Sequence, residues 1–214
     1  MRTAKQKIML LDNGREWGGG TNSMLELLKR IDRDAFDITC CFYHNYARGN
    51  GETIESVLNA IAIPVVFIPQ RKQPGWAKLA KEAARALLFF NRRLKKEAVD
   101  AIDARWRVRP NARKLRALLQ QGRYDTLYMN NQPSTNVEGY LAAQDLDIAV
   151  VQHCRIEPLM NARLAKIVND GCDAVIAVSH GVNQTLRDGG VEASRCFTVS
   201  NAIDIHQPLP DRKE

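Results

Sequence analysis

Residues 173–204 read DAVIAVSHGVNQTLRDGGVEASRCFTVSNAID, and this stretch decides the fold class. Residues 174–178 are apolar and mostly β-branched, which is typical of a strand buried on both faces. Ser179 follows at once and predicts the N-cap of a short helix, because its side-chain oxygen can accept a hydrogen bond from a free backbone N–H group. Gly-Gly at 189–190 ends that helix, and residues 196–200 are predicted to be the next strand. Strand, helix and strand in this order form the unit of a parallel sheet.

The same alternation of short apolar strands and amphipathic helices extends back to the N-terminus. In the first thirty residues the sequence predicts a strand, a glycine-rich loop and a helix capped by Thr21 or Asn22. The strands before the tail are predicted at 7–11, 36–42, 64–68, 126–129 and 148–152, and two further helices at 52–60 and 136–144. The predicted fold class is therefore α/β, a Rossmann-like, doubly wound parallel sheet in three layers.

Composition excludes several classes of protein. The chain has 214 residues and 45% hydrophobic content, which is enough for a substantial core. No run of eighteen uncharged apolar residues predicts a membrane-spanning helix, and the apolar run near the N-terminus is too short for a signal peptide. The five cysteines show no C-x-x-C spacing, so we expect reduced, buried thiols and no metal site. A cytoplasmic protein is expected.

A strongly basic segment interrupts the alternation. Residues 71–123 hold sixteen Lys and Arg against four Asp and Glu, a local net charge of +12. Apolar residues recur there at helical spacing, which predicts one long amphipathic helix or two helices with a break near Phe90 and Asn91. Pro110 is predicted to end this helical stretch, and Asn111 to cap the next helix. We treat about 71–122 as a basic helical insertion.

Three interpretations of the basic insertion stay open. It can present a solvated helix face, it can dock on an anionic membrane surface, or it can bind nucleic acid. Nucleic acid is disfavoured because no recognition motif accompanies the charges. The residues predicted to dock on a membrane are Trp76, Lys78, Lys81, Arg85, Arg92, Arg93, Lys95 and Lys96.

The end of the chain resembles a known family. Ser179, the glycine pair and Asn201-x-x-Asp204 resemble the end of the N-terminal domain in family-four, GT-B-fold glycosyltransferases. The resemblance implies that Asn201 and Asp204 lie near a hinge and that a second Rossmann-like domain binds the sugar nucleotide. Ala202 stands where the family usually has glycine, which departs from the expected turn.

The resemblance also implies a domain division. Residues 1–207 would form the acceptor-side, N-terminal Rossmann-like domain, and residues 208–214 would begin the linker to a C-terminal donor-binding domain that this sequence lacks. Many family members carry two glutamates eight positions apart in that second domain, and the sequence has no such pair.

The glycine-rich loop is the first candidate site. Gly18, Gly19 and Gly20 allow a close backbone approach, and the following helix offers free N–H groups to an anion. The spacing matches neither the dinucleotide fingerprint nor the P-loop. The resemblance implies that these glycines and Thr21 contact the diphosphate of the donor, whereas the alternative is a plain flexible turn.

Polar residues after two other strands form the second candidate site. His153 and Arg155 follow one predicted strand, and Asn130 and Asn131 follow another. Carboxyl ends of parallel strands bind ligands, and imidazole and amide groups suit sugar hydroxyls. We expect all four to contact the acceptor and His153 to be catalytic. The resemblance implies the acceptor-side position of His153, and Arg155 could pair with a phosphate or carboxylate. Alternatively, His153 is a buried structural histidine and the asparagines only form turns.

Together these observations predict the acceptor-binding half of a retaining, metal-independent glycosyltransferase. It would transfer a sugar from a nucleotide-sugar, a substrate and not a cofactor, to a glycan or lipid-linked acceptor, and would be inactive without its C-terminal domain. It would lie at the inner face of a membrane and bind no nucleic acid. The alternative is a free-standing, non-catalytic Rossmann-like module that binds anionic membranes.

Overall fold

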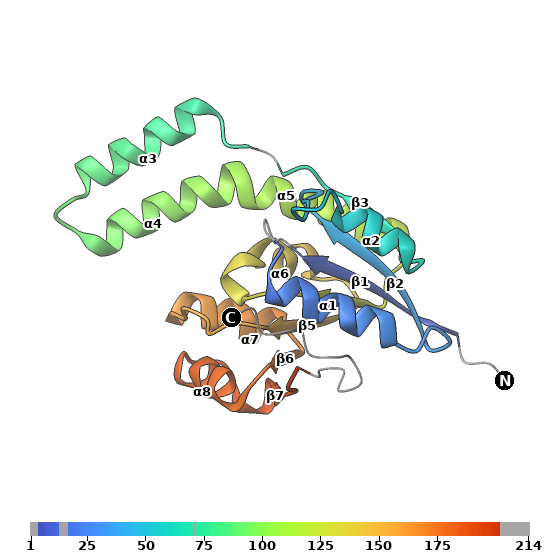
Figure 1. Cartoon of the computed structure of the whole chain (residues 1–214). Helices are drawn as coiled ribbons and strands as arrows, with labels where there is room; N and C mark the ends of the chain where they lie inside the picture. The colour runs from blue at the N-terminus through green and yellow to red at the C-terminus, as the bar shows by residue number, and fades with distance from the viewer. Residues whose placement is uncertain (1–3, 13–16, 71, 202–214) are drawn as a thin grey trace, which may run out of the picture.

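The structure is a computed structural model that describes residues 4–12, 17–70 and 72–201, apart from the side chain of Arg93. These residues form one seven-stranded sheet in the order β3-β2-β1-β4-β5-β6-β7, with every pair of neighbours parallel (Figure 1). The strands are β1 (Gln6–Asp12), β2 (Phe36–Phe42), β3 (Val65–Phe67), β4 (Thr126–Met129), β5 (Ala149–Cys154), β6 (Ala174–Ala177) and β7 (Cys196–Thr198). The predicted α/β, Rossmann-like fold is confirmed.

Helices connect these strands. They are α1 (Gly19–Arg30), α2 (Ile54–Ala60), α3 (Gly75–Leu87), α4 (Arg92–Asp103), α5 (Arg109–Gly122), α6 (Val137–Ala143), α7 (Ala162–Gly171) and α8 (His180–Asp188), with a π-turn at Ala104–Val108 and 3₁₀ turns at Pro133–Thr135 and Ala193–Arg195. The sequence analysis missed α7. Its signal was present, because the Asn161 side chain caps it by accepting a hydrogen bond from the Leu164 N–H group at 3.1 Å.

The strand order divides the core into two halves. Strands β2 and β3 lie on one side of β1, and β4 to β7 lie on the other. Right-handed crossovers then place α1 and α2 on one face of the sheet and α5 to α8 on the opposite face. Met24 and Leu28 belong to the first buried cluster, and Leu115, Leu119 and Leu127 to the second. The reversal between β1 and β4 is the switch point, where doubly wound sheets bind ligands.

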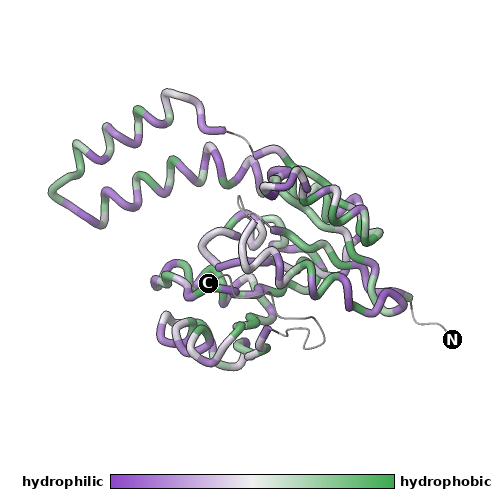
Figure 2. Tube along the Cα trace, viewed as in Figure 1, coloured by the Kyte–Doolittle hydropathy of each residue, from purple (hydrophilic) through white to green (hydrophobic). Residues whose placement is uncertain are grey.

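The basic insertion forms a helical hairpin. Helices α3 and α4 lie side by side and project from the body (Figure 1). The turn between them spans residues 88–91, so the prediction of two helices broken near Phe90 and Asn91 is confirmed. Figure 2 shows apolar and hydrophilic positions alternating along both helices.

The prediction that Pro110 ends the helix is wrong. The chain continues from α4 through the π-turn directly into α5, where Asn111 is fully buried and is not a cap. Proline has no N–H group and its ring crowds the preceding turn. The π-turn accommodates it, because the Arg109 N–H group bonds to the Ala104 carbonyl five residues back.

Of two predicted helix N-caps, the structure confirms one and contradicts the other. Ser179 caps α8 as predicted, since its hydroxyl accepts a hydrogen bond from the Val182 N–H group at 3.2 Å. The prediction that Thr21 or Asn22 caps α1 is wrong, because the helix begins at Gly19 and Gly18 is its N-cap. The Asn22 side chain instead accepts a hydrogen bond from the Trp17 indole at 2.8 Å.

The division between packed body and exposed hairpin predicts different costs for one substitution. Leu127→Ala, at a fully buried position, should lower the free energy of unfolding by about 2–5 kcal/mol because it leaves a cavity. Leu87→Ala, at a position that is 72% exposed, should change it by less than about 0.5 kcal/mol. Urea denaturation of both variants measures the difference, and similar costs would contradict the assignment of Leu127 to the core.

Candidate active site

The carboxyl ends of β1, β4 and β5 bring the predicted site residues to one edge of the sheet. Asp12 ends β1, Asn130 and Asn131 follow β4, and Arg155 follows β5. The β1–β4 register pairs Leu11 with Met129, so Asp12 and Asn130 lie beside each other across the switch point.

A buried carboxylate organises this edge. Asp12 is only 1% exposed, and each of its oxygens accepts a hydrogen bond of 2.7 Å, one from the Asn130 amide and one from the Asn131 amide. A buried carboxylate requires such donors, since it has lost its water. Asp12 was not predicted as a site residue, although an acidic residue directly after a buried strand was a readable signal.

Arg155 extends the network to the end of the described chain. Its Nε atom donates to the Asn130 side-chain oxygen at 2.5 Å, and its Nη1 atom donates to the Asn201 side-chain oxygen at 2.9 Å. Burial lowers the pKa of Arg155, and the Asp12 carboxylate opposes this shift. The proposed hinge residue Asn201 therefore contacts the proposed acceptor residue Arg155, while Asp204 lies outside the described residues.

The glycine-rich loop meets the same network at the start of α1. A Cβ atom built on Gly20 would lie 3.5 Å from the Asn131 side-chain oxygen and 3.6 Å from the Arg155 Cδ atom. Gly18 and Gly19 have no neighbour that such an atom would touch within 4 Å, so their backbone faces open space. Thr21 is buried and its hydroxyl lies 3.5 Å from that of Tyr46. The first turn of α1 and Arg155 thus share one rim.

His153 lies within β5 and is almost fully enclosed. It is 6% exposed, its Nδ1 atom shares a hydrogen bond with the Tyr128 hydroxyl, and its buried Nε2 atom has no partner among the described residues. Burial, together with the nearby positive charge of Arg155, lowers the pKa of His153 to about 3. Burial also raises the pKa of Tyr128 to about 12. At neutral pH the imidazole is uncharged and the phenol keeps its proton.

A second layer of amides fixes the loop after β4. The Gln152 amide donates to the Asn131 carbonyl at 2.9 Å, and its oxygen accepts from Asn136 at 3.0 Å and from the Tyr140 hydroxyl at 2.9 Å. The left-handed conformation of Asn131, with φ 76°, is held by these bonds. Sequence analysis missed Gln152 because a glutamine inside an apolar strand gives no periodic signal.

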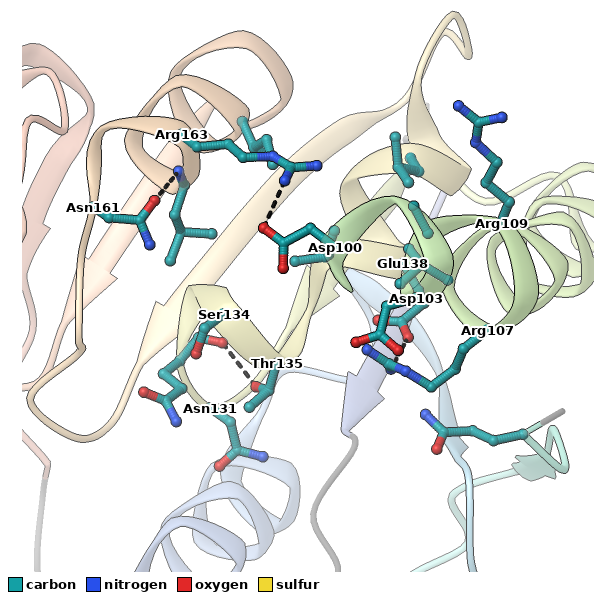
Figure 3. A pocket seen from close by; sticks show the side chains of 18 of the residues that line it. Asp100, Asp103, Arg107, Arg109, Asn131, Ser134, Thr135, Glu138, Asn161 and Arg163 are labelled. Atoms are coloured by element: carbon teal, nitrogen blue, oxygen red, sulfur yellow. Dashed lines mark hydrogen bonds and ion pairs between the residues drawn. The ribbon is translucent and has the colours of Figure 1, made fainter. Parts of the chain in front are cut away.

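A cavity of about 860 Å³ adjoins this edge. The π-turn and α4 form one wall, and the residues after β2, β4 and β5 and the start of α7 form the others (Figure 3). Asn131 and Gln132 lie in its lining, whereas His153 and Arg155 do not. The cavity and the buried network therefore meet at Asn131.

Ion pairs join the insertion to the body across this cavity. Arg107 of the π-turn pairs with buried Glu138 of α6 at 2.8 Å, and Asp100 of α4 pairs with Arg163 of α7 at 2.7 Å (Figure 3). Burial raises the pKa of Glu138, and the Arg107 charge opposes this. The second pair is more exposed, so its contribution to stability is small.

The predicted docking residues do not share one environment. Trp76, Lys78, Arg85 and Arg92 are exposed on the hairpin, Lys95 is half-buried, and Lys96 lines the cavity. The charge of Lys81 is engaged by Asp103 at 2.9 Å. The side chain of Arg93 is outside the described part of the structure.

The described residues offer neither a metal-binding cluster nor a membrane-spanning helix. They contain no group of three or more His, Cys, Asp or Glu side chains placed to hold a metal ion. Their helices include none with the length and apolar character needed to span a membrane.

Comparison with known proteins identifies a family to which the chain is similar. Residues 17–207 match Glycosyltransferase Family 4, whereas a search of curated protein sequences gives no match.

Solved structures of similar fold include the following three. HepE of Anabaena in complex with UDP and glucose aligns with a TM-score of 0.60 and 17% identity over 94% of this chain and 46% of its own. The lipopolysaccharide outer core galactosyltransferase WaaB has a TM-score of 0.52 and 13% identity over 98% and 50%. A UDP-N-acetylglucosamine 2-epimerase of Rickettsia bellii has a TM-score of 0.51 and 11% identity over 92% and 45%. The chain spans about half the length of the solved structures it matches.

The depressed pKa of His153 makes stability depend on pH. Below pH 6.5 the histidine is protonated in the unfolded chain, whereas in the folded protein it stays neutral down to about pH 3. Protonation therefore favours the unfolded state. Between pH 6.5 and 5 the wild type should lose about 2 kcal/mol more stability than His153→Gln. Urea denaturation across this range tests the effect, and parallel stability curves would contradict the depressed pKa.

Proposed function

Because this chain belongs to Glycosyltransferase Family 4, we propose that it supplies the acceptor-binding half of a glycosyltransferase. The reaction would move a sugar from a nucleotide-sugar to a hydroxyl group of a glycan or lipid-linked acceptor. One observation carries the proposal: the buried Nε2 atom of His153 has no partner among the described residues, beside the hydrogen-bonded network of Asp12, Asn130 and Arg155. Family membership gives no support to the alternative of a non-catalytic module.

Similarity to larger proteins supports the proposal that a second domain binds the sugar donor. HepE is known in complex with UDP and glucose, and this chain corresponds to about half of it. We assign residues 1–207 to an N-terminal, acceptor-side domain, residues 208–214 to the start of a linker, and donor binding to a C-terminal domain. Gly18 to Gly20 and Thr21 would approach the donor diphosphate, since open glycine backbone at the start of a helix favours an anion.

The proposed role of His153 is to contact and orient the acceptor hydroxyl. A histidine with a pKa of about 3 is a weak base at neutral pH, so transfer of the hydroxyl proton to it would be inefficient. Its neutral ring can still hydrogen-bond a hydroxyl through Nε2. Arg155 and the two asparagines would contact the acceptor sugar, with Asn201 and Asp204 at the hinge.

The cavity beside the network gives the acceptor room. Its volume of about 860 Å³ lies in the range of sites for small organic ligands. Amides of Asn131 and Gln132 line one part, and Leu141 and Ile156 line another. Such a mixed lining suits an acceptor that joins a sugar to an apolar group, which favours a lipid-linked acceptor over a free glycan.

The hairpin is proposed to dock the protein on an anionic membrane at its cytoplasmic face. Leu87, Phe89 and Phe90 at its tip are 72%, 74% and 71% exposed, although large apolar residues usually lie inside. Arg85 and Arg92 flank them. Aromatic side chains in the interface and cations at the headgroups together favour membrane binding.

Acceptor binding is testable with the 214-residue chain. Saturation-transfer NMR against a panel of oligosaccharides and short polyprenol-linked glycans should reveal a bound member, and His153→Ala should weaken it about 3- to 10-fold by removing a hydrogen bond. Exposed His180→Ala is the matched control. The chain alone should release no UDP from UDP-glucose, because catalysis needs both substrates in one cleft. Turnover by the chain alone, or unaltered binding in His153→Ala, would contradict the proposal.

Docking is tested by sedimentation with anionic phosphatidylglycerol vesicles. The double variant Phe89→Ser/Phe90→Ser should partition at least tenfold more weakly, since each buried aromatic side chain contributes about 1.5–3 kcal/mol. Raising the salt concentration to about 1 M should also weaken binding by screening. Leu159→Ser removes an 88% exposed side chain from the body and serves as the control; equal losses in both variants would refute a specific role for the tip.

A further inference from the structure

We propose that the insertion carries a second binding site, which takes a phosphate or diphosphate group at a small hollow lined by Arg105, Trp106, Arg109, Pro110 and Arg113. We call this hollow the arginine niche. It spans the π-turn and the start of α5, apart from the Asp12 network. Its ligand chemistry does not depend on the proposed sugar transfer.

The three arginines have the spacing of one helix face. They are four residues apart in the sequence, and residues four apart lie above one another on a helix. Figure 3 shows Arg109 pointing away from Asp103 and Arg107. Like charges at this spacing repel one another, and a bound anion would relieve that repulsion.

Within the part of the chain that the structure describes, the niche arginines have no ion pair or side-chain hydrogen bond. Neighbouring basic residues differ, since Arg107 pairs with Glu138 and Lys81 pairs with Asp103. Arg107 thus has a carboxylate partner at the cavity, whereas the three guanidinium groups of the niche have none among the described residues. Uncompensated cations on one face attract an anionic ligand.

An aromatic pair makes part of the niche rigid. The Arg105 guanidinium lies over the Trp106 ring, with 5.3 Å between its Cζ atom and the ring centroid. Trp76 of α3 packs edge-on against Trp106, with 4.5 Å between the ring centroids. A cation held over an aromatic ring is oriented before the ligand arrives, which lowers the entropy lost on binding.

The size of the niche selects the ligand class. Its volume of about 210 Å³ corresponds to about seven water molecules at roughly 30 Å³ each. A phosphate or diphosphate fits such a space, whereas a complete nucleotide-sugar does not. Guanidinium groups bind phosphate oxygens with two parallel hydrogen bonds, so three of them match a multiply charged phosphate ester.

The niche adjoins the large cavity through one residue. Arg109 lines both, so a phosphate held in the niche would lie at the border of that cavity. The tip of the hairpin is far away, because Phe90 and Arg109 are separated by about 28 Å along a helix that rises about 1.5 Å per residue. A soluble phosphate ester and a lipid headgroup carry the same chemistry, and the test distinguishes them.

The test uses the 214-residue chain and three variants. The niche variant is Arg105→Gln/Arg109→Gln/Arg113→Gln. The control variant, Arg48→Gln/Arg123→Gln/Arg187→Gln, removes the same charge from exposed positions elsewhere. Arg109→Lys keeps the charge but loses the two-pronged hydrogen bonding. Thermal denaturation checks that the niche variant is folded, as expected for substitutions on an exposed face.

Calorimetric titration at low salt measures pyrophosphate binding. The wild type should bind one equivalent saturably; the niche variant should bind at least tenfold more weakly, Arg109→Lys several-fold more weakly, and the control variant within twofold of wild type. Sedimentation with phosphatidylcholine vesicles containing phosphatidic acid tests the headgroup source with the same variants. Niche-dependent binding of pyrophosphate alone assigns the site to a soluble phosphate ester, and niche-dependent retention on vesicles assigns it to a headgroup. If neither probe depends on the niche arginines more than on the control arginines, the proposal is overturned.

Discussion

The buried carboxylate of Asp12 requires hydrogen-bond donors, and this requirement fixes how the neighbouring strand ends are arranged. At 1% exposure it has exchanged water for the amides of Asn130 and Asn131, and removing either donor would weaken the compensation of a buried charge. Asn130 can meet it only because β1 and β4 are neighbours at the switch point. The other end of the Asn130 amide accepts from Arg155, which reaches Asn201 in turn. One charge thus links three strand ends to the last described residue of the chain.

The insertion gives this edge a second wall. A proline in the middle of a helix normally bends or ends it, yet the π-turn before Pro110 lets the chain run on from the hairpin into the body. That continuity directs Arg107 to Glu138 and leaves the cavity between the helix and the sheet. The same turn places the paired Arg107 at the cavity and Arg105 on the niche, while Arg109 borders both.

The sequence predicted the fold better than the site. Apolar strands and the cap at Ser179 follow from local chemistry, so the α/β class and the family resemblance are confirmed. The predictions for Pro110 and Thr21 were wrong because local preference was overridden. A π-turn accommodates the proline, and α1 already begins at Gly19, before Thr21. The roles assigned to the site residues stay predictions. Gln152 was missed because its importance arises from contacts between strands that no single segment encodes, whereas Asp12 directly follows a predicted strand and its signal was overlooked.

The electrostatics of the site limit the chemistry that its residues can perform. His153 is neutral across the physiological range and Tyr128 keeps its proton, so neither supplies or removes a proton easily. Arg155 is held by Asn130 and Asn201 before any ligand arrives. Groups arranged in this way are suited to orienting a substrate and not to transferring protons. Their neighbours fix their positions, so they need not reorganise during a reaction. In the proposed function, the charge that develops at the sugar would therefore be stabilised mainly from the donor side, while this domain fixes the direction from which the acceptor hydroxyl attacks.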